Sequence, residues 1–267
     1  MLKKRLIFTL LYNSGSFSLS RNFTLQMAGG VSWLKRNYNF QKVAYFIDEL
    51  IILDVSRDKR NAESFCDAIR TVAEHCFVPI SAGGGVTNIS YAKSLMKAGA
   101  DKIVVNSALF HDQRFVKELV REYGSQCVVA SLDIMRKTEN SFEIYTKNGN
   151  CVQEGSCSEL ISQAVSLGVG ELYVNSMNQD GTGQGFDLGI VQFLFSQSPV
   201  PVIIAGGAGH SLHLIEGLRD PCVDAVATAN LFNFVGDGLE RARNEITASG
   251  IEIAYWENIN HSRLRNR

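Results

Sequence analysis

The sequence lacks a dominant charge, a long apolar run and a metal-binding cysteine pattern. Its 27 acidic and 26 basic residues leave a formal net charge of −1, so no strong field draws the surface toward nucleic acid or a membrane. No apolar run approaches the ~18 residues of a membrane-spanning helix. The six cysteines include no C-x-x-C pair, which favours a reducing cytoplasm, no metal and no other cofactor. We therefore expect a cytoplasmic protein with soluble partners.

The start of the chain has the order of a signal peptide but not its length. Basic residues 3–5 precede the apolar residues 6–12, which continue into Asn13-Ser14-Gly15 without a small-residue cleavage site. We expect a buried strand here.

The chain also lacks a polar or Pro/Gly-rich linker near its middle, although it contains two copies of one pattern. A shift of 122 places Val78-Pro79-Ile80 over Val200-Pro201-Val202, and Gly84-Gly85 over Gly206-Gly207. A repeat without a linker favours one closed body. We predict a single domain with half-barrels at about 1–122 and 123–253, followed by a polar basic tail at about 254–267.

Eight short apolar runs recur along the chain, each followed by a turn and a helical pattern. They are residues 5–11, 50–55, 77–81, 102–105, 127–132, 171–174, 201–204 and 225–227. Continuous Val/Ile/Leu runs indicate strands covered on both faces, and their alternation with helices indicates parallel units. The sequence therefore predicts the α/β class and a (β/α)₈ TIM barrel.

The predicted helices cover residues 61–75, 88–98, 112–123, 157–167, 188–195 and 211–218. Asp112 is expected to cap its helix, and Gly99 and Gly168 to end theirs. Residues 142–152 alternate around an Asn-Gly pair, which predicts a small hairpin after the fifth strand.

Glycine-rich turns follow four of the predicted strands, where the active site of such a barrel lies. Gly84-Gly85 follows the third strand and Asn106-Ser107 the fourth; their repeat partners Gly206-Gly207 and Ala229-Asn230 follow the seventh and eighth. Glycine lets backbone N–H groups approach a phosphate, although tight turns need glycine anyway. The duplication favours a phosphorylated small molecule with a phosphate at each end.

A long glycine-rich loop, residues 175–185, follows the sixth strand and contains one acid, Asp180, before Gly181. Such a loop can fold over a ligand, with Asp180 accepting from a ribose hydroxyl. The alternative is that Asp180 caps Gly181 and its neighbours locally.

Five motifs together resemble the HisF family, the synthase (cyclase) subunit of imidazole glycerol phosphate synthase. They are Ser81-Ala82-Gly83-Gly84-Gly85, Gly99-Ala100-Asp101-Lys102 through Val105-Asn106-Ser107-Ala108, Gly124-Ser125-Gln126-Cys127-Val128-Val129, Asp180-Gly181-Thr182 and Ala205-Gly206-Gly207-Ala208-Gly209. The resemblance runs from Leu2 to about Ile253. It implies a lyase-type enzyme whose glutaminase partner docks on the amino-terminal mouth and sends ammonia through the barrel to a bisphosphate substrate. It also implies two catalytic aspartates, at the ends of strands one and five.

The chain departs from this family at the catalytic mouth. Asp133 matches the second aspartate, but Leu11 stands where the first should be. Leu19 replaces a family lysine, and Asn175 and Ala205 replace a threonine and a serine. Because the family reaction needs proton transfers at two places, these changes predict impaired cyclase chemistry.

The opposite mouth keeps the family's pattern. Arg5, Glu49, Lys102 and Glu171 match a ring of charges that gates ammonia entry in the family. The alternative is a purely structural ring, since buried charges of opposite sign satisfy each other. Asp101 and Gln126, which match family positions at the glutaminase interface, favour the ammonia port.

Three functions remain open. The preferred one is a HisF paralogue that forms a heterodimer with a HisH-like glutaminase and passes ammonia to a separate ATP-dependent sugar amidotransferase. The resemblance places such paralogues in amidino- or amino-sugar pathways of surface polysaccharides, such as the lipopolysaccharide O-antigen. The second is an authentic cyclase of histidine biosynthesis that works with Asp133 alone. The third is a non-catalytic scaffold that activates its glutaminase.

Overall fold

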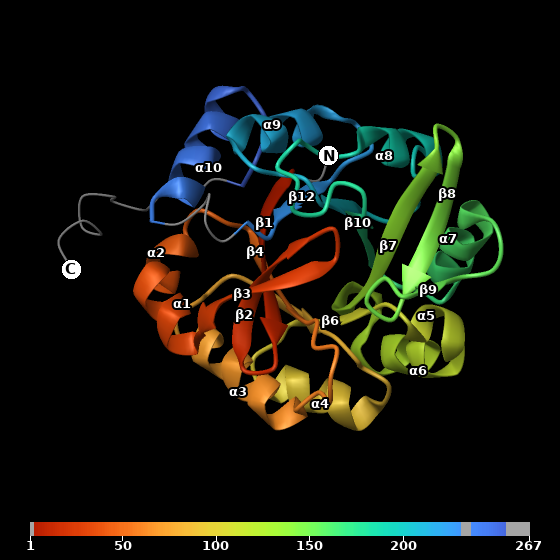
Figure 1. Cartoon of the computed structure of the whole chain (residues 1–267), viewed down its shortest axis with the longest axis horizontal. Coiled ribbons are helices and arrows are strands. Elements are labelled where there is room, and N and C mark those ends of the chain that lie inside the picture. Colours follow the sequence, from red (N-terminus) through yellow and green to blue (C-terminus); the bar gives the residue numbers. More distant parts are fainter. Residues whose placement is uncertain (1–2, 231–235, 255–267) are drawn as a thin grey trace.

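Eight parallel strands form a closed barrel in the computed structural model of the chain, which describes residues 3–230 and 236–254. In chain order they are β1 (Arg5–Asn13), β4 (Glu49–Asp54), β5 (Ile80–Gly83), β6 (Lys102–Val105), β7 (Val128–Thr138), β10 (Glu171–Ser176), β11 (Val202–Ala205) and β12 (Ala225–Thr228). Parallel pairing of β7 with β10 and of β12 with β1 closes the ring. Figure 1 shows this barrel inside a circle of helices. The predicted (β/α)₈ TIM barrel is confirmed.

Each barrel strand alternates between the interior and the surrounding helices. On β1, Leu6, Phe8 and Leu10 belong to the large core under the helices, whereas Ile7 belongs to a smaller cluster inside the barrel. Residues two apart therefore share the interior. This alternation places the first inward residue of a strand at the floor of the barrel and the last one at its carboxyl mouth.

The six predicted helices form within about three residues of their predicted bounds. They are α3 (Ala62–Ala73), α4 (Ile89–Lys97), α6 (Gln113–Tyr123), α7 (Cys157–Ser166), α8 (Leu188–Leu194) and α9 (Ser211–Arg219). The Asp112 side chain accepts a hydrogen bond from Phe115 N, which confirms the predicted cap. Gly99 and Gly168 follow α4 and α7 with positive φ, as predicted for helix ends.

Four further helices were not predicted. They are α1 (Val31–Asn37), α2 (Phe40–Val43), α5 (Ala108–His111) and α10 (Gly238–Ala248). The first three have at most seven residues, too short for a clear 3.6-residue period. A 3₁₀ turn, Ser125–Cys127, precedes β7, so the predicted start of the fifth barrel strand at Cys127 was one residue early. No described helix is long and apolar enough to cross a membrane.

The predicted start of the third barrel strand was also early. The prediction began at Phe77, but β5 begins at Ile80, after Pro79. Phe77 is 53% exposed and its ring packs on Tyr45, 4.7 Å away between centroids. Phe77 has a high strand propensity, but it lies on the surface at the floor of the barrel and not in a strand.

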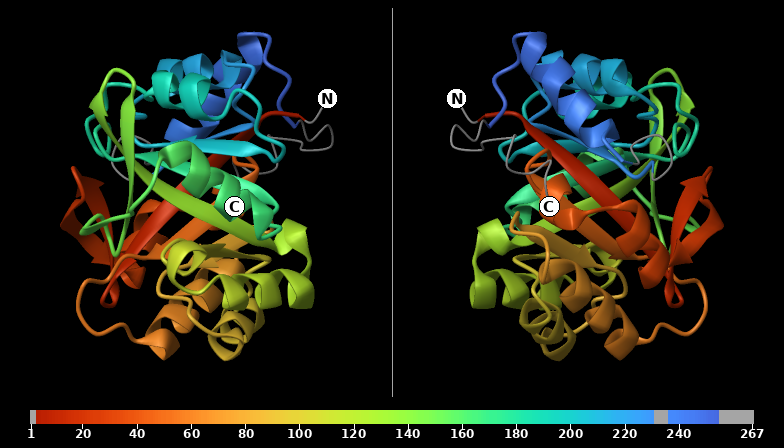
Figure 2. Two further views of the ribbon diagram at one scale, coloured as in Figure 1. Left: turned by 90° about the vertical axis from the view of Figure 1, so that its right-hand side faces the viewer. Right: turned by 90° about the vertical axis from the view of Figure 1, so that its left-hand side faces the viewer.

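Two hairpins extend from the carboxyl end of the barrel. The predicted one forms as β8 (Ser141–Thr146) and β9 (Cys151–Val152), and β8 also pairs with a long extension of β7. The other, β2 (Ser16–Arg21) with β3 (Thr24–Gly30), was not predicted. Figure 2 shows both hairpins on the same side of the molecule. Together they surround the mouth of the barrel. The predicted tail lies almost wholly outside the described residues.

Candidate functional site

A pocket of about 740 Å³ lies at the carboxyl ends of the strands. It is lined by every residue that the sequence proposed for catalysis or phosphate binding. These are Asp133, Gly84, Gly85, Asn106, Ser107, Asp180, Gly181, Gly206, Gly207, Ala229 and Asn230. Residues from six different loops and strand ends therefore meet in one cavity. The charged ring of the barrel floor lies at the other end.

Asp133 lies on the pocket floor between two amides. Asn175 Nδ2 donates to its Oδ1 at 3.1 Å, and Asn106 Nδ2 donates to its Oδ2 at 3.2 Å. Burial raises the pKa of Asp133 to about 6 against the two hydrogen bonds, and the charge of Asp180 adds to the rise. A carboxyl with this pKa can both hold and release a proton near neutral pH.

The wall opposite this polar cluster is apolar. Leu11 pairs in register with Leu53, and Leu19 from the β2–β3 hairpin lines the same pocket. Asp54, the next residue of β4, does not replace the missing acid. Its side chain is buried, with Oδ1 accepting from Ser56 N and Oδ2 3.8 Å from Arg60 Nε. The pocket thus offers one inward-facing acid at the ends of strands one and five.

The raised pKa of Asp133 makes the free energy of unfolding depend on pH. The folded state holds this proton more tightly than the unfolded chain, so ionisation removes stability as pH rises from about 4 to about 6. We expect Asp133→Asn to stabilise the protein by on the order of 1–3 kcal/mol near pH 7.5, and the gain to vanish near pH 4. Urea unfolding at both pH values measures it.

Asp187→Asn is the matched control for that experiment. Asp187 accepts from Arg136 Nε at 2.8 Å in an ion pair, so its loss should destabilise the protein at neutral pH. An Asp133→Asn protein whose stability difference from the unmodified chain is the same at both pH values would contradict the account.

The glycine turns are shaped by close backbone approach. Gly84 has φ +114°, and a Cβ there would lie 2.2 Å from Asp54 O. Gly207 has φ +105°, and a Cβ there would lie 1.9 Å from Gly185 O. Only glycine fits either position. These turns are required by packing, whether or not their N–H groups also bind phosphate.

Asp180 joins two loops across the mouth. Its Oδ2 accepts from Ser20 Oγ at 2.6 Å and from Phe23 N at 2.8 Å, both in the β2–β3 hairpin. The carboxylate therefore caps that hairpin turn, where Asn22 and Phe23 have positive φ. Its hydrogen bonds do not form the local cap of Gly181 that was the alternative to a ligand-binding role. No local pattern around Asp180 indicated a partner about 160 positions away.

Four cations surround the pocket and were not predicted. Arg21, Arg57, Arg60 and Lys147 all line it, and Arg57 donates to Phe23 O. They come from three separate loops, so no run of basic residues marked them. Their charge suits a phosphorylated ligand. Among residues 3–230 and 236–254, no cluster of three or more His, Cys, Asp or Glu is placed to hold a metal.

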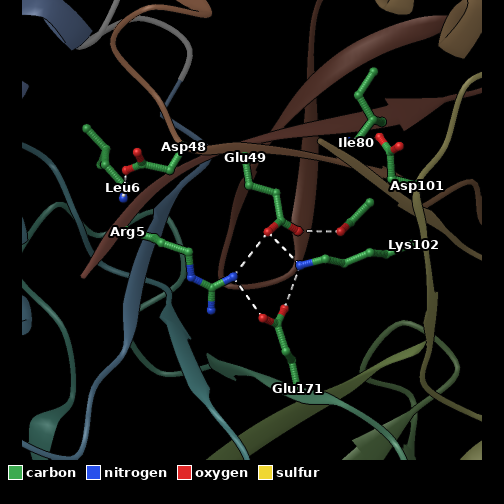
Figure 3. Close-up of polar contacts among 9 residues, drawn as sticks. Arg5, Leu6, Asp48, Glu49, Ile80, Asp101, Lys102 and Glu171 are labelled. Atoms are coloured by element: carbon green, nitrogen blue, oxygen red, sulfur yellow. Dashed lines mark hydrogen bonds and ion pairs between the residues drawn. The ribbon is translucent and has the colours of Figure 1, made fainter. Parts of the chain in front are cut away.

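Four charges form a closed ring at the barrel floor (Figure 3). Arg5 Nη1 lies 3.2 Å from Glu49 Oε2 and 2.8 Å from Glu171 Oε1. Lys102 Nζ lies 2.8 Å from Glu49 Oε2 and 3.0 Å from Glu171 Oε2. Ser81 Oγ donates to the remaining oxygen of Glu49. Each cation therefore bridges both carboxylates.

Burial acts to lower the pKa of Lys102, but the charges of Glu49 and Glu171 outweigh it and raise the pKa. Lys102 therefore stays positively charged although its side chain is largely buried. Glu49 is only 2% exposed, so Arg5 and Lys102, and not solvent, compensate its charge.

The two proposed interface residues lie at the same floor. Asp101 Oδ2 accepts from Ile80 N at 2.8 Å (Figure 3). Asp48 and Asp224 make the same bond to Leu6 N and Val202 N. Asp101 is therefore one of three aspartates that accept a hydrogen bond from a backbone N–H near the start of a barrel strand. Gln126 is exposed in the 3₁₀ turn before β7.

Comparison with known proteins agrees with this geometry. A family model described as "Histidine biosynthesis protein" matches residues 24–236. A curated protein of Parasynechococcus marenigrum (strain WH8102), described as "Putative imidazole glycerol phosphate synthase subunit hisF2", is 45% identical over 257 residues. That alignment covers 96% of this chain and 95% of the relative.

Proposed function

The chain belongs to the HisF family, the synthase subunits of imidazole glycerol phosphate synthase, and on that premise we propose that it conducts ammonia without efficient cyclisation. In this proposal a HisH-like glutaminase docks on the floor of the barrel beside Asp101 and Gln126. Ammonia enters through the charged ring and leaves at the carboxyl mouth.

The charged ring carries the proposal. If the ring only stabilised the floor of the barrel, apolar residues of similar volume would stabilise it as well or better. Buried charges at this place are better explained by a polar molecule, such as ammonia, that passes between them. The chain keeps all four charges while its opposite mouth has lost one of two acids. Retention at one end and change at the other favour a chain that still receives ammonia but uses it differently.

The acceptor in this proposal is a separate ATP-dependent sugar amidotransferase, in the assembly of an amidino or amino sugar for a surface polysaccharide. The apolar wall formed by Leu11, Leu19 and Leu53 supports an acceptor outside this pocket, because those side chains can neither donate nor accept a proton and so cannot assist cyclisation.

One observation favours the second candidate, an authentic cyclase. Asp133, with its pKa raised to about 6, is suited to serve alternately as acid and base. The gene neighbourhood separates the two readings, since histidine genes favour the cyclase and nucleotide-sugar genes favour the conduit.

The binding experiment tests the conduit directly. The chain and the HisH-like glutaminase of its own organism are mixed, and complex formation and glutamine hydrolysis are measured. We expect a stable heterodimer that Asp101→Lys weakens. Asn140→Lys, in the exposed turn between β7 and β8 at the carboxyl end of the barrel, is the control away from the floor. Failure of the unmodified chain to bind the glutaminase would end the proposal.

The phosphate sites give an independent prediction. The N–H groups at Gly84-Gly85 and Gly206-Gly207 border the pocket, and the four cations of its rim add charge. A crystal grown from sulfate or phosphate should contain an anion at one or both turns, held mainly by backbone N–H groups. Ordered side chains filling both turns instead would contradict a phosphorylated ligand.

A further inference from the structure

An aromatic side chain lies inside the barrel between the ring and the pocket. Along β10, Glu171, Tyr173 and Asn175 alternate inward: Glu171 joins the ring and Asn175 binds Asp133. Tyr173 lies between them, ~7 Å along the strand from each. It is 5% exposed and packs in the interior cluster with Ile7, Ile51, Val104, Val129, Ile203, Ala205, Ala225 and Ala227. Any molecule that crosses the barrel passes this phenol.

The interior at this level is apolar except for a few hydroxyls. Thr9, which faces Tyr173 from β1, is 1% exposed, and its Oγ1 has no hydrogen-bond partner among the described residues. Ser131 lies beside Tyr173 in the register of β7 with β10. A buried hydroxyl without a hydrogen bond costs free energy. A small bound molecule with both donor and acceptor capacity would satisfy Thr9 and Tyr173 together.

The pocket reaches down to this layer. Tyr173, Val104 and Ala227 are among the residues that line it. The alanines at positions 205, 225 and 227 on β11 and β12 are the smallest side chains of the cluster that contains Tyr173. The phenol layer therefore borders the pocket directly.

The charges around the phenol favour a neutral occupant. Burial raises the pKa of Tyr173, while the nearby Thr9 hydroxyl opposes the rise and the charge of Asp133 adds to it. The phenol therefore stays protonated and can donate to a lone pair. Glu49 and Glu171 below are each bridged by Arg5 and Lys102, so the ring itself offers no uncompensated carboxylate that would attract an ammonium ion from water at the floor.

We propose that the hydroxyls of Tyr173 and Thr9 form a binding station for one small neutral hydrogen-bonding molecule: ammonia in transit, and water at rest. The phenol donates to the lone pair, and Thr9 Oγ1 accepts an N–H or O–H. The transit part of this proposal rests on the conduit function proposed above, whereas the station itself rests only on the two hydroxyls.

Crystallography tests the station without any partner. The unmodified chain, Tyr173→Phe and Thr9→Val are crystallised, each with and without a soak in hydroxylamine, an amine that is neutral at neutral pH. We expect one solvent peak about 2.7–3.2 Å from both hydroxyls, which becomes a two-atom peak after the soak. Both features should be absent from the two variants, which keep nearly the same side-chain volume.

A direct Tyr173–Thr9 hydrogen bond without a solvent peak would overturn the station, as would a peak that persists in Tyr173→Phe. A peak that stays round after the soak identifies a site for water only and overturns the assignment to ammonia.

Isotope transfer tests the transit part. In the complex with glutaminase and acceptor, amide-labelled ¹⁵N-glutamine competes with unlabelled ammonium for the same product. Tyr173→Phe should lower the ratio of labelled to unlabelled product about 2- to 10-fold, the effect of one hydrogen bond. Ile203→Val, which trims the side chain paired with Tyr173, should leave the ratio unchanged. An unchanged ratio in Tyr173→Phe overturns the transit role. No label transfer in the unmodified complex instead defeats the conduit, and the crystallographic result stands apart from it.

Discussion

Cyclase turnover with ammonium salts is expected to be about 10²–10⁴-fold below that of a two-aspartate family member, the usual effect of losing a general acid or base. By its resemblance to the family, Leu11 is expected to stand at the first of the two acid positions, and both Leu11 and Asp133 line the pocket. The assay supplies the family's bisphosphate substrate and ammonium, with no glutaminase. It therefore isolates the chemistry of the carboxyl mouth from ammonia delivery.

The structure predicts how far single changes restore this activity. Leu11→Asp alone should restore little, because Leu19 still lines the pocket where the family has lysine and Asn175 already binds Asp133. The second carboxylate also raises the pKa of Asp133 further, since like charges disfavour ionisation. Leu11→Asp with Leu19→Lys should recover more than either single change. Robust turnover by the unmodified chain would defeat the prediction.

Removal of the cation in Lys102→Met is expected to have two large effects. Glu49 and Glu171 each lose one of two bridging cations, so stability should fall by on the order of 3 kcal/mol, as for other broken buried pairs. Chemical unfolding measures this loss. Arg241→Met, which removes a pair exposed to solvent on α10, should cost only ~0.5 kcal/mol and serves as control.

The second effect of Lys102→Met, on ammonia delivery, distinguishes a ring that conducts ammonia from a ring that only stabilises the floor. If the ring only braces the floor, the folded variant should deliver glutamine nitrogen as the unmodified chain does. If the ring gates ammonia, the glutaminase should still bind, while the amount of aminated product per glutamate released changes. Comparison with Arg241→Met in the same complex corrects for any general loss of stability. An unchanged ratio would reject the port.

The barrel could be predicted from sequence because its strands are continuous apolar runs with glycine or polar turns between them. The β2–β3 hairpin could not. Its turn is Asn22-Phe23, where a phenylalanine has φ +59°, and bulky residues rarely adopt that conformation. The turn is held by Asp180 and Arg57. Contacts over such separations leave no local pattern.

The site residues divide in the same way. The glycine turns were found because the repeat showed them twice, and the ring was found by resemblance, since single charges at strand starts have no distinctive spacing. Tyr173 was missed because a tyrosine within an apolar strand run is typical of any buried strand. Only the register with Ser131 and the placement of Thr9 reveal that its hydroxyl lies in the barrel interior.

The origin of nitrogen in the product tests the conduit most directly. The unmodified chain, its glutaminase and the amidotransferase acceptor receive ¹⁵N-amide glutamine together with a large excess of unlabelled ammonium, and mass spectrometry reads the aminated product. The account predicts that the product carries mostly ¹⁵N, because ammonia released at the floor reaches the acceptor through the barrel without mixing with solvent. A product whose label matches the bulk ammonium pool would contradict it.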